Sequence, residues 1–204
     1  MEHTKLNVIL NDVKNGRPVI IIDDSNREDE ADIVIAAEAV TKYNLIFAMR
    51  HAKGLMCIPC TQVKLDQFNI KMMNSNNLDT LGTPFATSID ATKDTSTGMS
   101  VYDRLKTIQT FVNDECKPSD LAQPGHLFPL CGKPNLLKDR RGHTESSLEL
   151  VKLAGFKPIS VIIEIMNDDG TMTKGEQIFE FAKIYNLNII TVDEIFNAVY
   201  NQSL

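Results

Sequence analysis

The apolar run Val19–Ile22 leads directly into the most acidic stretch of the chain, and this transition constrains the fold more than any other feature. Six carboxylates fall within the ten residues 23–32. Clustered anions repel one another and resist leaving water, so they rarely end a buried strand without a reason. The usual reasons are a divalent cation, a cationic partner or a proton-transfer task. The alternative is a solvated acidic loop in which Arg27 pairs with a neighbouring carboxylate.

The pattern of apolar residues predicts a single α+β domain, residues 1–204, with a mixed β-sheet flanked by helices. Strands are predicted at 19–23, 33–36, 55–58, 85–89, 159–166 and 188–190. Helices are predicted at 4–13, 42–53, 101–112, 144–154, 176–185 and after the capping box at 191–194. Residues 61–83 are predicted to be irregular. Repeated prolines and glycines between 118 and 134 are expected to exclude a long helix or a central strand.

Composition and charge narrow the class of protein. Of the 204 residues, 43% are hydrophobic, and no stretch has the length and apolarity of a membrane span. The start of the chain lacks a secretory signal, and four cysteines in such a chain are typical of reduced thiols, so we expect a cytoplasmic protein. The net charge of −6 argues against a nucleic-acid partner, which would require a basic face.

Three carboxylates of the acidic stretch are candidates for a site. Glu28, Glu30 and Asp32 alternate, so in an extended loop all three would face the same side. Mg²⁺ needs only one or two carboxylates together with water and substrate oxygens. The loop therefore offers enough ligands for an ion, and the remaining carboxylates are available as bases.

A second candidate site lies at Arg140–Thr144. Two arginines and a glycine before a helix offer guanidinium groups and free backbone N–H groups, which together suit a phosphate or sugar phosphate. His143 lies within this stretch, and a neutral imidazole can bind a metal or move a proton. The alternative is an ordinary helix start whose arginines face water.

Two single residues give weaker signals. Glu164 is a lone carboxylate in an apolar strand. If it points inward it must be paired or protonated, and either state suits acid–base catalysis; if it points outward it is the polar face of an edge strand. His126 follows Pro124 and Gly125 on a predicted tight turn, where the alternative is an ordinary surface residue.

The loop 95–100 and Cys57 complete the candidates. The loop has hydroxyl groups and a glycine suited to phosphate, but it lacks the lysine of a Walker motif. Cys57 follows the basic residues Arg50, His51 and Lys53, which would favour a reactive thiolate, whereas general burial tendencies favour an inert thiol. Taken together, the candidate sites predict an enzyme that acts on a small, phosphorylated, oxygen-rich substrate.

At these residues the chain resembles the 3,4-dihydroxy-2-butanone 4-phosphate synthase family of riboflavin biosynthesis. The resemblance covers nearly the whole chain in the expected order. The matching stretches are Val19–Glu38, Arg50–His51, Gly54–Cys57, Thr97–Arg104, Lys117–Leu121, Pro124–Leu130, Gly142–Glu145 and Glu164–Met172.

The resemblance implies that D-ribulose 5-phosphate is converted to 3,4-dihydroxy-2-butanone 4-phosphate and formate, with Mg²⁺ or Mn²⁺ and two ions per site when substrate is bound. It implies a homodimer with sites near the interface and no membrane or nucleic-acid partner. Glu28 and His143 would bind metal. The residues that would contact substrate are Arg27, Asp32, Thr97, Arg140, Gly142 and Thr144. The residues available for catalysis are His126, Glu164, Glu30 and Asp32.

The chain departs from the family pattern in the acidic stretch. The family commonly reads Arg-Glu-Asn-Glu-Gly-Asp where this chain has Asp29 and Ala31 at the third and fifth positions. Asp29 adds a charge, and Ala31 lacks the easy positive φ of glycine, so the geometry of the loop stays open. The alternatives are a metal-assisted pentose-phosphate isomerase or aldolase, which shares the enediolate step, and a nucleotide- or RNA-binding module. The net charge and an aromatic content of only 6% argue against the binding module.

Overall fold

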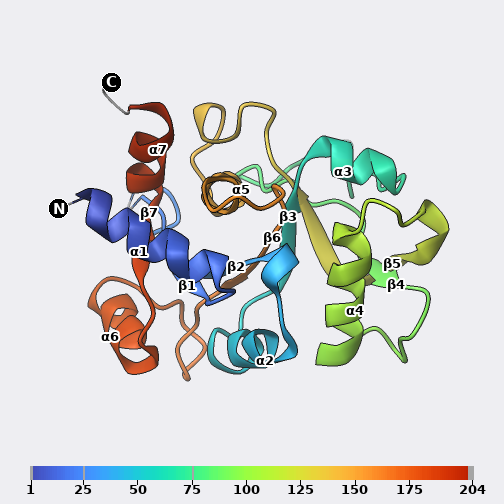
Figure 1. The fold of residues 1–204 in the computed structure, drawn as a ribbon, viewed down its shortest axis with the longest axis horizontal. Coiled ribbons are helices and arrows are strands. Elements are labelled where there is room, and N and C mark those ends of the chain that lie inside the picture. The colour runs from blue at the N-terminus through green and yellow to red at the C-terminus, as the bar shows by residue number, and fades with distance from the viewer. Residues whose placement is uncertain (1, 25, 75, 202–204) are drawn as a thin grey trace.

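A mixed seven-stranded sheet runs through the molecule, in the order β4-β5-β3-β6-β2-β1-β7 (Figure 1). The computed structural model describes residues 2–24, 26–74 and 76–201, so Ser25 of the acidic stretch lies outside the described residues. The pairs β1/β7 and β3/β5 are parallel and the other pairs are antiparallel. The strands are β1 Val19–Ile22, β2 Ala31–Ala36, β3 Cys57–Cys60, β4 Ile89–Ala91, β5 Leu121–Cys131, β6 Ser160–Glu164 and β7 Ile189–Thr191. The predicted α+β class is confirmed.

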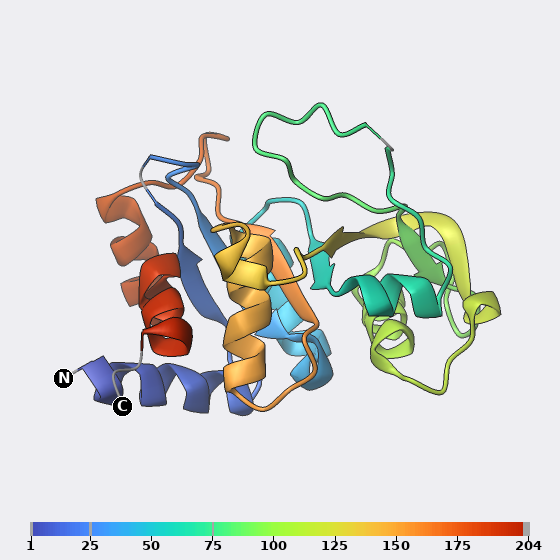
Figure 2. The ribbon, with the colours of Figure 1, turned by 90° about the horizontal axis from the view of Figure 1, so that it is seen from above.

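Helices cover both faces of this sheet (Figure 2). Helices α1, α5 and α7 pack on one face, and α2, α4 and α6 pack on the other. The helices are α1 Glu2–Lys14, α2 Lys42–His51, α3 Gln62–Gln67, α4 Val101–Val112, α5 His143–Leu153, α6 Glu176–Tyr185 and α7 Val192–Tyr200. Among the described residues, none of the helices is both long enough and apolar enough to cross a membrane.

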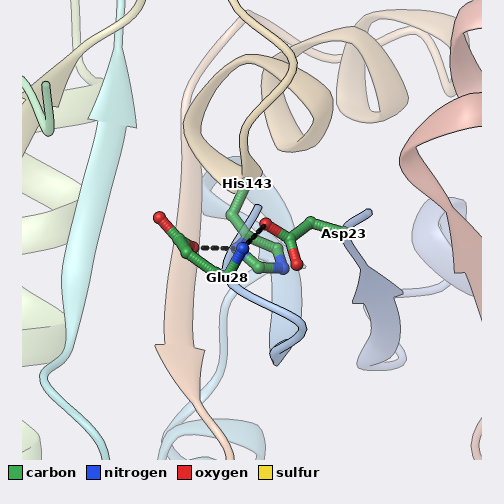
Figure 3. A group of neighbouring side chains, drawn as sticks. All are labelled: Asp23, Glu28 and His143. Carbon is green, nitrogen blue, oxygen red and sulfur yellow. Dashed lines mark hydrogen bonds and ion pairs between the residues drawn. The ribbon is translucent and has the colours of Figure 1, made fainter. Parts of the chain in front are cut away.

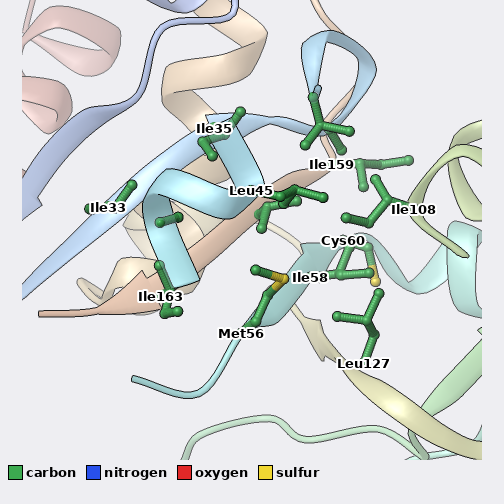
Figure 4. Packing of buried hydrophobic residues seen from close by; sticks show 14 of the residues in the cluster. Ile33, Ile35, Leu45, Met56, Ile58, Cys60, Ile108, Leu127, Ile159 and Ile163 are labelled. Carbon is green, nitrogen blue, oxygen red and sulfur yellow. The ribbon is translucent and has the colours of Figure 1, made fainter. Parts of the chain in front are cut away.

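Alternation along the central strands divides the apolar residues between two cores. In β2, Ile33 and Ile35 belong to the core beneath α2 (Figure 4), whereas Val34 belongs to the core beneath α5. Ile163 and Ile162 of β6 divide in the same way. Burial on both faces explains why these strands are continuously apolar in sequence. It also places Asp32 and Glu164, by alternation, on the face that α5 covers.

The capping signals identify helix starts correctly, with one difference in detail. Thr41 and Asn44 form a reciprocal capping box at α2, and Thr191 begins α7 with the same arrangement. Ser100 accepts a hydrogen bond from the backbone N–H of Asp103, as expected. The carboxylate of Asp103 does not complete a capping box with the backbone of Ser100; it accepts hydrogen bonds from the backbone N–H groups of Ser96 and Gly98 in the preceding loop.

Helix α3 was not predicted, because residues 61–83 lack apolar periodicity. Its start is capped by Thr61, whose hydroxyl accepts from the backbone N–H of Lys64. Lys64 is nevertheless buried, and its ammonium group donates to the carbonyl of Val112 and to Asp114. Because a charged residue occupies a buried position of this six-residue helix, the sequence does not show the apolar spacing that would identify an amphipathic helix. The remaining residues of this segment that the structure describes lack a helix or named strand.

The expectation that prolines exclude a central strand was wrong for β5, an eleven-residue strand between β4 and β3. The carbonyl of Pro129 accepts a hydrogen bond from the backbone N–H of Ala86. Because the nitrogen and the carbonyl of a strand residue face the same side, the N–H that proline lacks would also face Ala86, and the pairing with β3 is left intact. Pro124 lies in the irregular stretch 123–126, between residues that pair in order with β4. The named strands β3 and β4 also begin later than the predicted 55–58 and 85–89.

Candidate active site

The acidic loop between β1 and β2 is organised by Asp23. Its carboxylate accepts hydrogen bonds from the backbone N–H groups of Glu28 (3.3 Å) and Glu30 (3.1 Å). The Arg27 guanidinium lies 2.7 Å from the same carboxylate and 2.7 Å from that of Glu28. These contacts fold residues 26–28 into a turn. Alternation along an extended loop is therefore not what brings Glu28, Glu30 and Asp32 to one pocket.

The family departures in this loop have different consequences. Asp29 adopts a left-handed conformation, with φ of 54°, which costs less for Asp than for most residues other than glycine. Ala31 is the first residue of β2 and pairs with Ile22, so position 31 does not require a positive φ. Lys174 supports the turn by donating to the carbonyl of Glu28 at 3.0 Å.

His143, the first residue of α5, meets the acidic loop. Its Nδ1 lies 3.2 Å from Oε2 of Glu28, 115 positions earlier in the chain (Figure 3). The same nitrogen lies 3.9 Å from Oδ1 of Asp32. Among the described residues, His143 Nε2 and Asp32 Oδ1 are buried polar atoms without a hydrogen-bond partner. Because such atoms are costly to leave unpaired, they point to a ligand.

The contact between Glu28 and His143 is a strong ion pair. Burial by itself raises the pKa of Glu28, but the hydrogen bond with His143 and the charge of Arg27 outweigh burial and lower this pKa to about 2. Burial lowers the pKa of His143, but the charge of Asp32 and the hydrogen bond with Glu28 raise it to about 9. In the absence of a ligand, the two side chains therefore stabilise each other in their charged forms.

Asp32 and Glu164 lie opposite each other on β2 and β6. Burial raises the pKa of Asp32 to about 7, with the charge of His143 opposing this rise and that of Glu164 adding to it. Burial also raises the pKa of Glu164, whose Oε2 accepts from the backbone N–H of Leu55 at 2.7 Å. A Cβ at Gly54 would lie 2.4 Å from that oxygen, so the position needs glycine. Glu164 thus points into the site, as the catalytic interpretation required.

Two guanidinium groups meet at the start of α5. A Cβ at Gly142 would lie 2.4 Å from Nη1 of Arg140 and 3.0 Å from Nη2 of Arg27. Arg140 is held by the fully buried Glu145, with Nη1 and Oε2 2.8 Å apart. Arg141, by contrast, pairs with Asp193 at 2.6 Å. The expectation that Arg140 and Arg141 act together was therefore wrong for Arg141. The two guanidinium groups that meet at the helix start are those of Arg140 and Arg27, and together they suit an anion.

Most of the predicted site residues line one pocket of about 200 Å³. The residues that line it are Arg27, Glu28, Glu30, Asp32, Leu81, Thr83, Phe85, Leu130, Arg140, His143, Thr144, Ile162 and Glu164. The sequence did not identify the contributions of residues 81–85, because this segment has no periodic pattern. We call this group of lining residues the acid pocket.

Asp23, Glu28 and His143 could hold a metal ion, since ligand atoms from all three lie within 4.8 Å of one another. Two carboxylates and one imidazole suit a divalent cation. The unpartnered Nε2 of His143 agrees with this donor set. Asp23 was not predicted as a ligand, although its position at the end of an apolar strand was the available signal.

Thr97 and His126 lie elsewhere and do not line the acid pocket. Thr97 is exposed in the loop before α4. His126 lies in β5, where its Nδ1 is 2.6 Å from Oδ2 of Asp90. Within one chain, the residues implied by the family resemblance therefore form two separate groups.

Cys57 is buried at the start of β3, with 2% of its surface exposed. Burial, together with the nearby charges of Glu164 and Asp32, raises the pKa of its thiol. A protonated, inaccessible thiol is a poor nucleophile. These observations agree with the inert interpretation of Cys57.

Comparisons with known proteins identify the family of this chain. The sequence profile of the 3,4-dihydroxy-2-butanone 4-phosphate synthase family matches residues 7–198. The enzyme of that name from Yersinia enterocolitica is 43% identical over 191 residues, which cover 94% of this chain and 87% of the relative. A similar protein from Edwardsiella ictaluri is 40% identical, covering 91% and 85% of the two chains.

A solved structure extends the similarity to three dimensions. The crystal structure of a 3,4-dihydroxy-2-butanone 4-phosphate synthase in complex with two magnesium ions superposes with a TM-score of 0.91. It is 33% identical to this chain, and the match covers 97% of both. The chain therefore belongs to the 3,4-dihydroxy-2-butanone 4-phosphate synthase family, whose members are lyases of riboflavin biosynthesis.

Proposed function

We propose that this chain converts D-ribulose 5-phosphate into 3,4-dihydroxy-2-butanone 4-phosphate and formate through an enediolate. The observation that carries the proposal is the pairing of Glu28 with His143 beside buried, unpartnered atoms. The reaction balances, because one water is lost in dehydrating the sugar and one water is consumed in releasing formate.

Glu28 and His143 would hold a divalent cation, Mg²⁺ or Mn²⁺, with two ions per site when substrate is bound. Asp23 lies close enough to join them. When bound, such a cation stabilises negative charge on neighbouring substrate oxygens. The two magnesium ions in the related crystal structure support this choice of metal.

The phosphate of the substrate would lie at the start of α5. Arg27 and Arg140 supply positive charge there, and Gly142 leaves room for their guanidinium groups. Thr144 lines the same pocket. A helix N-terminus adds further stabilisation of an anion.

The proton transfers would fall to three other carboxylates that line the acid pocket, those of Glu30, Asp32 and Glu164. Burial raises the pKa of Asp32 to about 7, so this group can give or take a proton near neutral pH. Burial also raises the pKa values of Glu30 and Glu164. These three side chains are therefore suited to removing a proton from carbon and returning protons to oxygen.

We further propose a cytoplasmic homodimer with its sites near the interface. Thr97 and His126 lie outside the acid pocket of their own chain, and a second copy would give them a pocket to act on. The four free cysteines support a reducing compartment.

The activity is tested by incubating the protein with ribulose 5-phosphate, with and without a chelator, and measuring formate. We expect formate release that the chelator stops. A pentose-phosphate isomerase or an aldolase would consume the sugar without producing formate, and that result would overturn the proposal.

The dimer is tested by mixing two inactive variants, Glu28→Gln and His126→Gln. If each site combines Glu28 of one chain with His126 of the other, each mixed dimer regains one of its two sites. Random pairing of equal amounts makes about half of the dimers mixed, so the mixture should regain about a quarter of the wild-type activity. If both residues act within one chain, mixing restores nothing.

A further inference from the structure

Asp90 and His126 form a closely held pair on neighbouring strands, outside the acid pocket. One oxygen of Asp90, Oδ2, lies 2.6 Å from Nδ1 of His126. The other, Oδ1, accepts the backbone N–H of His126 at 3.0 Å. A single carboxylate thus holds both the ring and the main chain of the histidine.

The loop before α4 closes over this pair. Gly98 adopts a φ of 87°, and a Cβ there would lie 2.0 Å from Oδ2 of Asp90 and 2.6 Å from Nδ1 of His126. The loop is fixed in turn by Asp103, whose carboxylate accepts from the backbone N–H groups of Ser96 (2.9 Å) and Gly98 (3.2 Å). The contact is therefore enclosed on the side where the two side chains meet.

The imidazole of His126 nevertheless stays partly exposed. The side chain of Asp90 is 14% exposed, whereas that of His126 is 44% exposed. An ionised carboxylate can only accept a hydrogen bond, so the 2.6 Å contact with Asp90 favours a proton on Nδ1 of His126. Nε2 is left as the nitrogen that can accept or donate a proton outside the pair.

We propose that Asp90 is the positioning residue of His126, fixing the ring in the Nδ1–H form so that Nε2 faces the reaction. This inference rests on the proposed role of His126 in catalysis. The alternative is that the same contacts only hold the irregular stretch of β5 against β4. The two roles differ in what they predict for the imidazole and for turnover.

The tautomer is measured directly by ¹⁵N NMR of the wild-type protein, at a pH where imidazoles are neutral. The His126→Gln variant identifies the resonances of His126. We expect the Nδ1–H form, against the usual preference of free histidine for Nε2–H. A predominantly Nε2–H ring at His126 would overturn the proposal, whatever the activity shows.

Turnover is compared in Asp90→Asn and in Asp94→Asn, a matched change at an exposed aspartate that pairs with Lys106. We expect Asp90→Asn to lower kcat by about 10- to 100-fold with KM within about twofold, and Asp94→Asn to have no effect.

The outcomes separate this inference from the proposed function. If Asp90→Asn turns over like the wild type while His126→Gln is inactive, the positioning role is wrong and the proposed function is unaffected. Full activity in His126→Gln would remove the catalytic role of the histidine, which the positioning role requires. If Asp90→Asn does not fold, the wild-type NMR measurement still decides the tautomer.

Discussion

The acid pocket and the Asp90–His126 pair both join a histidine to carboxylates, but they differ in how their polar atoms are satisfied. In the acid pocket, the His143 side chain is 7% exposed and its Nε2 is unpartnered. In the other region, His126 has its Nδ1 paired and its side chain 44% exposed. A buried unpaired atom costs about 1–3 kcal/mol, which a ligand can relieve. The comparison shows that the first region keeps buried polar atoms unpartnered, as a ligand site requires, whereas the second pairs one imidazole nitrogen and leaves the side chain partly exposed.

The largest expected effect comes from removing the charged pair of the acid pocket. Glu28→Gln and His143→Ala should each lower kcat by at least about a thousandfold, because each removes a proposed ligand of the cation that stabilises developing charge. Formate release measures the loss, and circular dichroism checks that the fold is retained.

The matched control is Glu180→Gln, at an exposed glutamate of α6. It should leave turnover unchanged. If folded Glu28→Gln or His143→Ala released formate at the wild-type rate, the acid pocket would not be the ligand-binding region.

Metal binding should stabilise the protein through the acid pocket alone. At a Mg²⁺ concentration of a hundred times Kd, wild-type protein should gain about 2.7 kcal/mol in free energy of unfolding. Glu28→Gln should lose this gain, whereas Asp90→Asn should keep it. Thermal unfolding with and without Mg²⁺ gives the comparison. An equal loss in both variants would mean that the two regions share one ion site.

A smaller effect is expected at Glu145, which holds Arg140. Glu145→Gln removes the charge that fixes the guanidinium and should raise KM for ribulose 5-phosphate by about tenfold, with less effect on kcat. Inhibition by inorganic phosphate should weaken in parallel. The control is Glu149→Gln on the same helix, a buried glutamate that pairs with Lys152. Equal KM values in the two variants would show that Glu145 serves only the fold.

The smallest effect concerns the loop that covers the Asp90–His126 pair. The hydrogen bond from the backbone N–H of Ser96 is the main cause that lowers the pKa of Asp103 to about 2, and the hydroxyl of Ser96 adds to this effect. Since this pKa is below the unfolded value, the stabilisation is complete above about pH 4 and is lost as the pH falls toward 2.

Asp103→Asn should therefore lower the unfolding temperature at neutral pH, and its difference from wild type should shrink below about pH 4. Asp94→Asn should cause a smaller loss at neutral pH, because its pair with Lys106 is exposed. A difference between Asp103→Asn and wild type that does not change with pH would show that the carboxylate charge plays no part.

The sequence predicted the fold best where one signal decides the structure. The β-branched runs identified the central strands, and alternation places Asp32 and Glu164 on one face. The prediction from the sequence failed where contacts between residues far apart in the chain override local signals. Pro129 is accepted in β5 because its N side faces Ala86 and not β3.

The site was predictable to a similar extent. Glu28 and His143 could be chosen from residue type and family resemblance, but their meeting depends on the packing of α5 over the sheet. Asp90 carried no signal of its own, since it reaches His126 only through the irregular pairing of β4 with β5. Arg141 shows that a local motif is not sufficient to predict a site residue, because its guanidinium pairs with Asp193 of α7.

The position of Asp32 within a strand buried on both faces limits how members of this family can diverge. Asp32 is fixed between Ile21 and Glu164 by the register of three strands. A single-residue insertion upstream in β2 would turn this carboxylate toward the opposite core and remove it from the chemistry. We therefore expect length changes during evolution to accumulate in connections that do not line the acid pocket, while the spacing from Ala31 to Ala36 stays invariant.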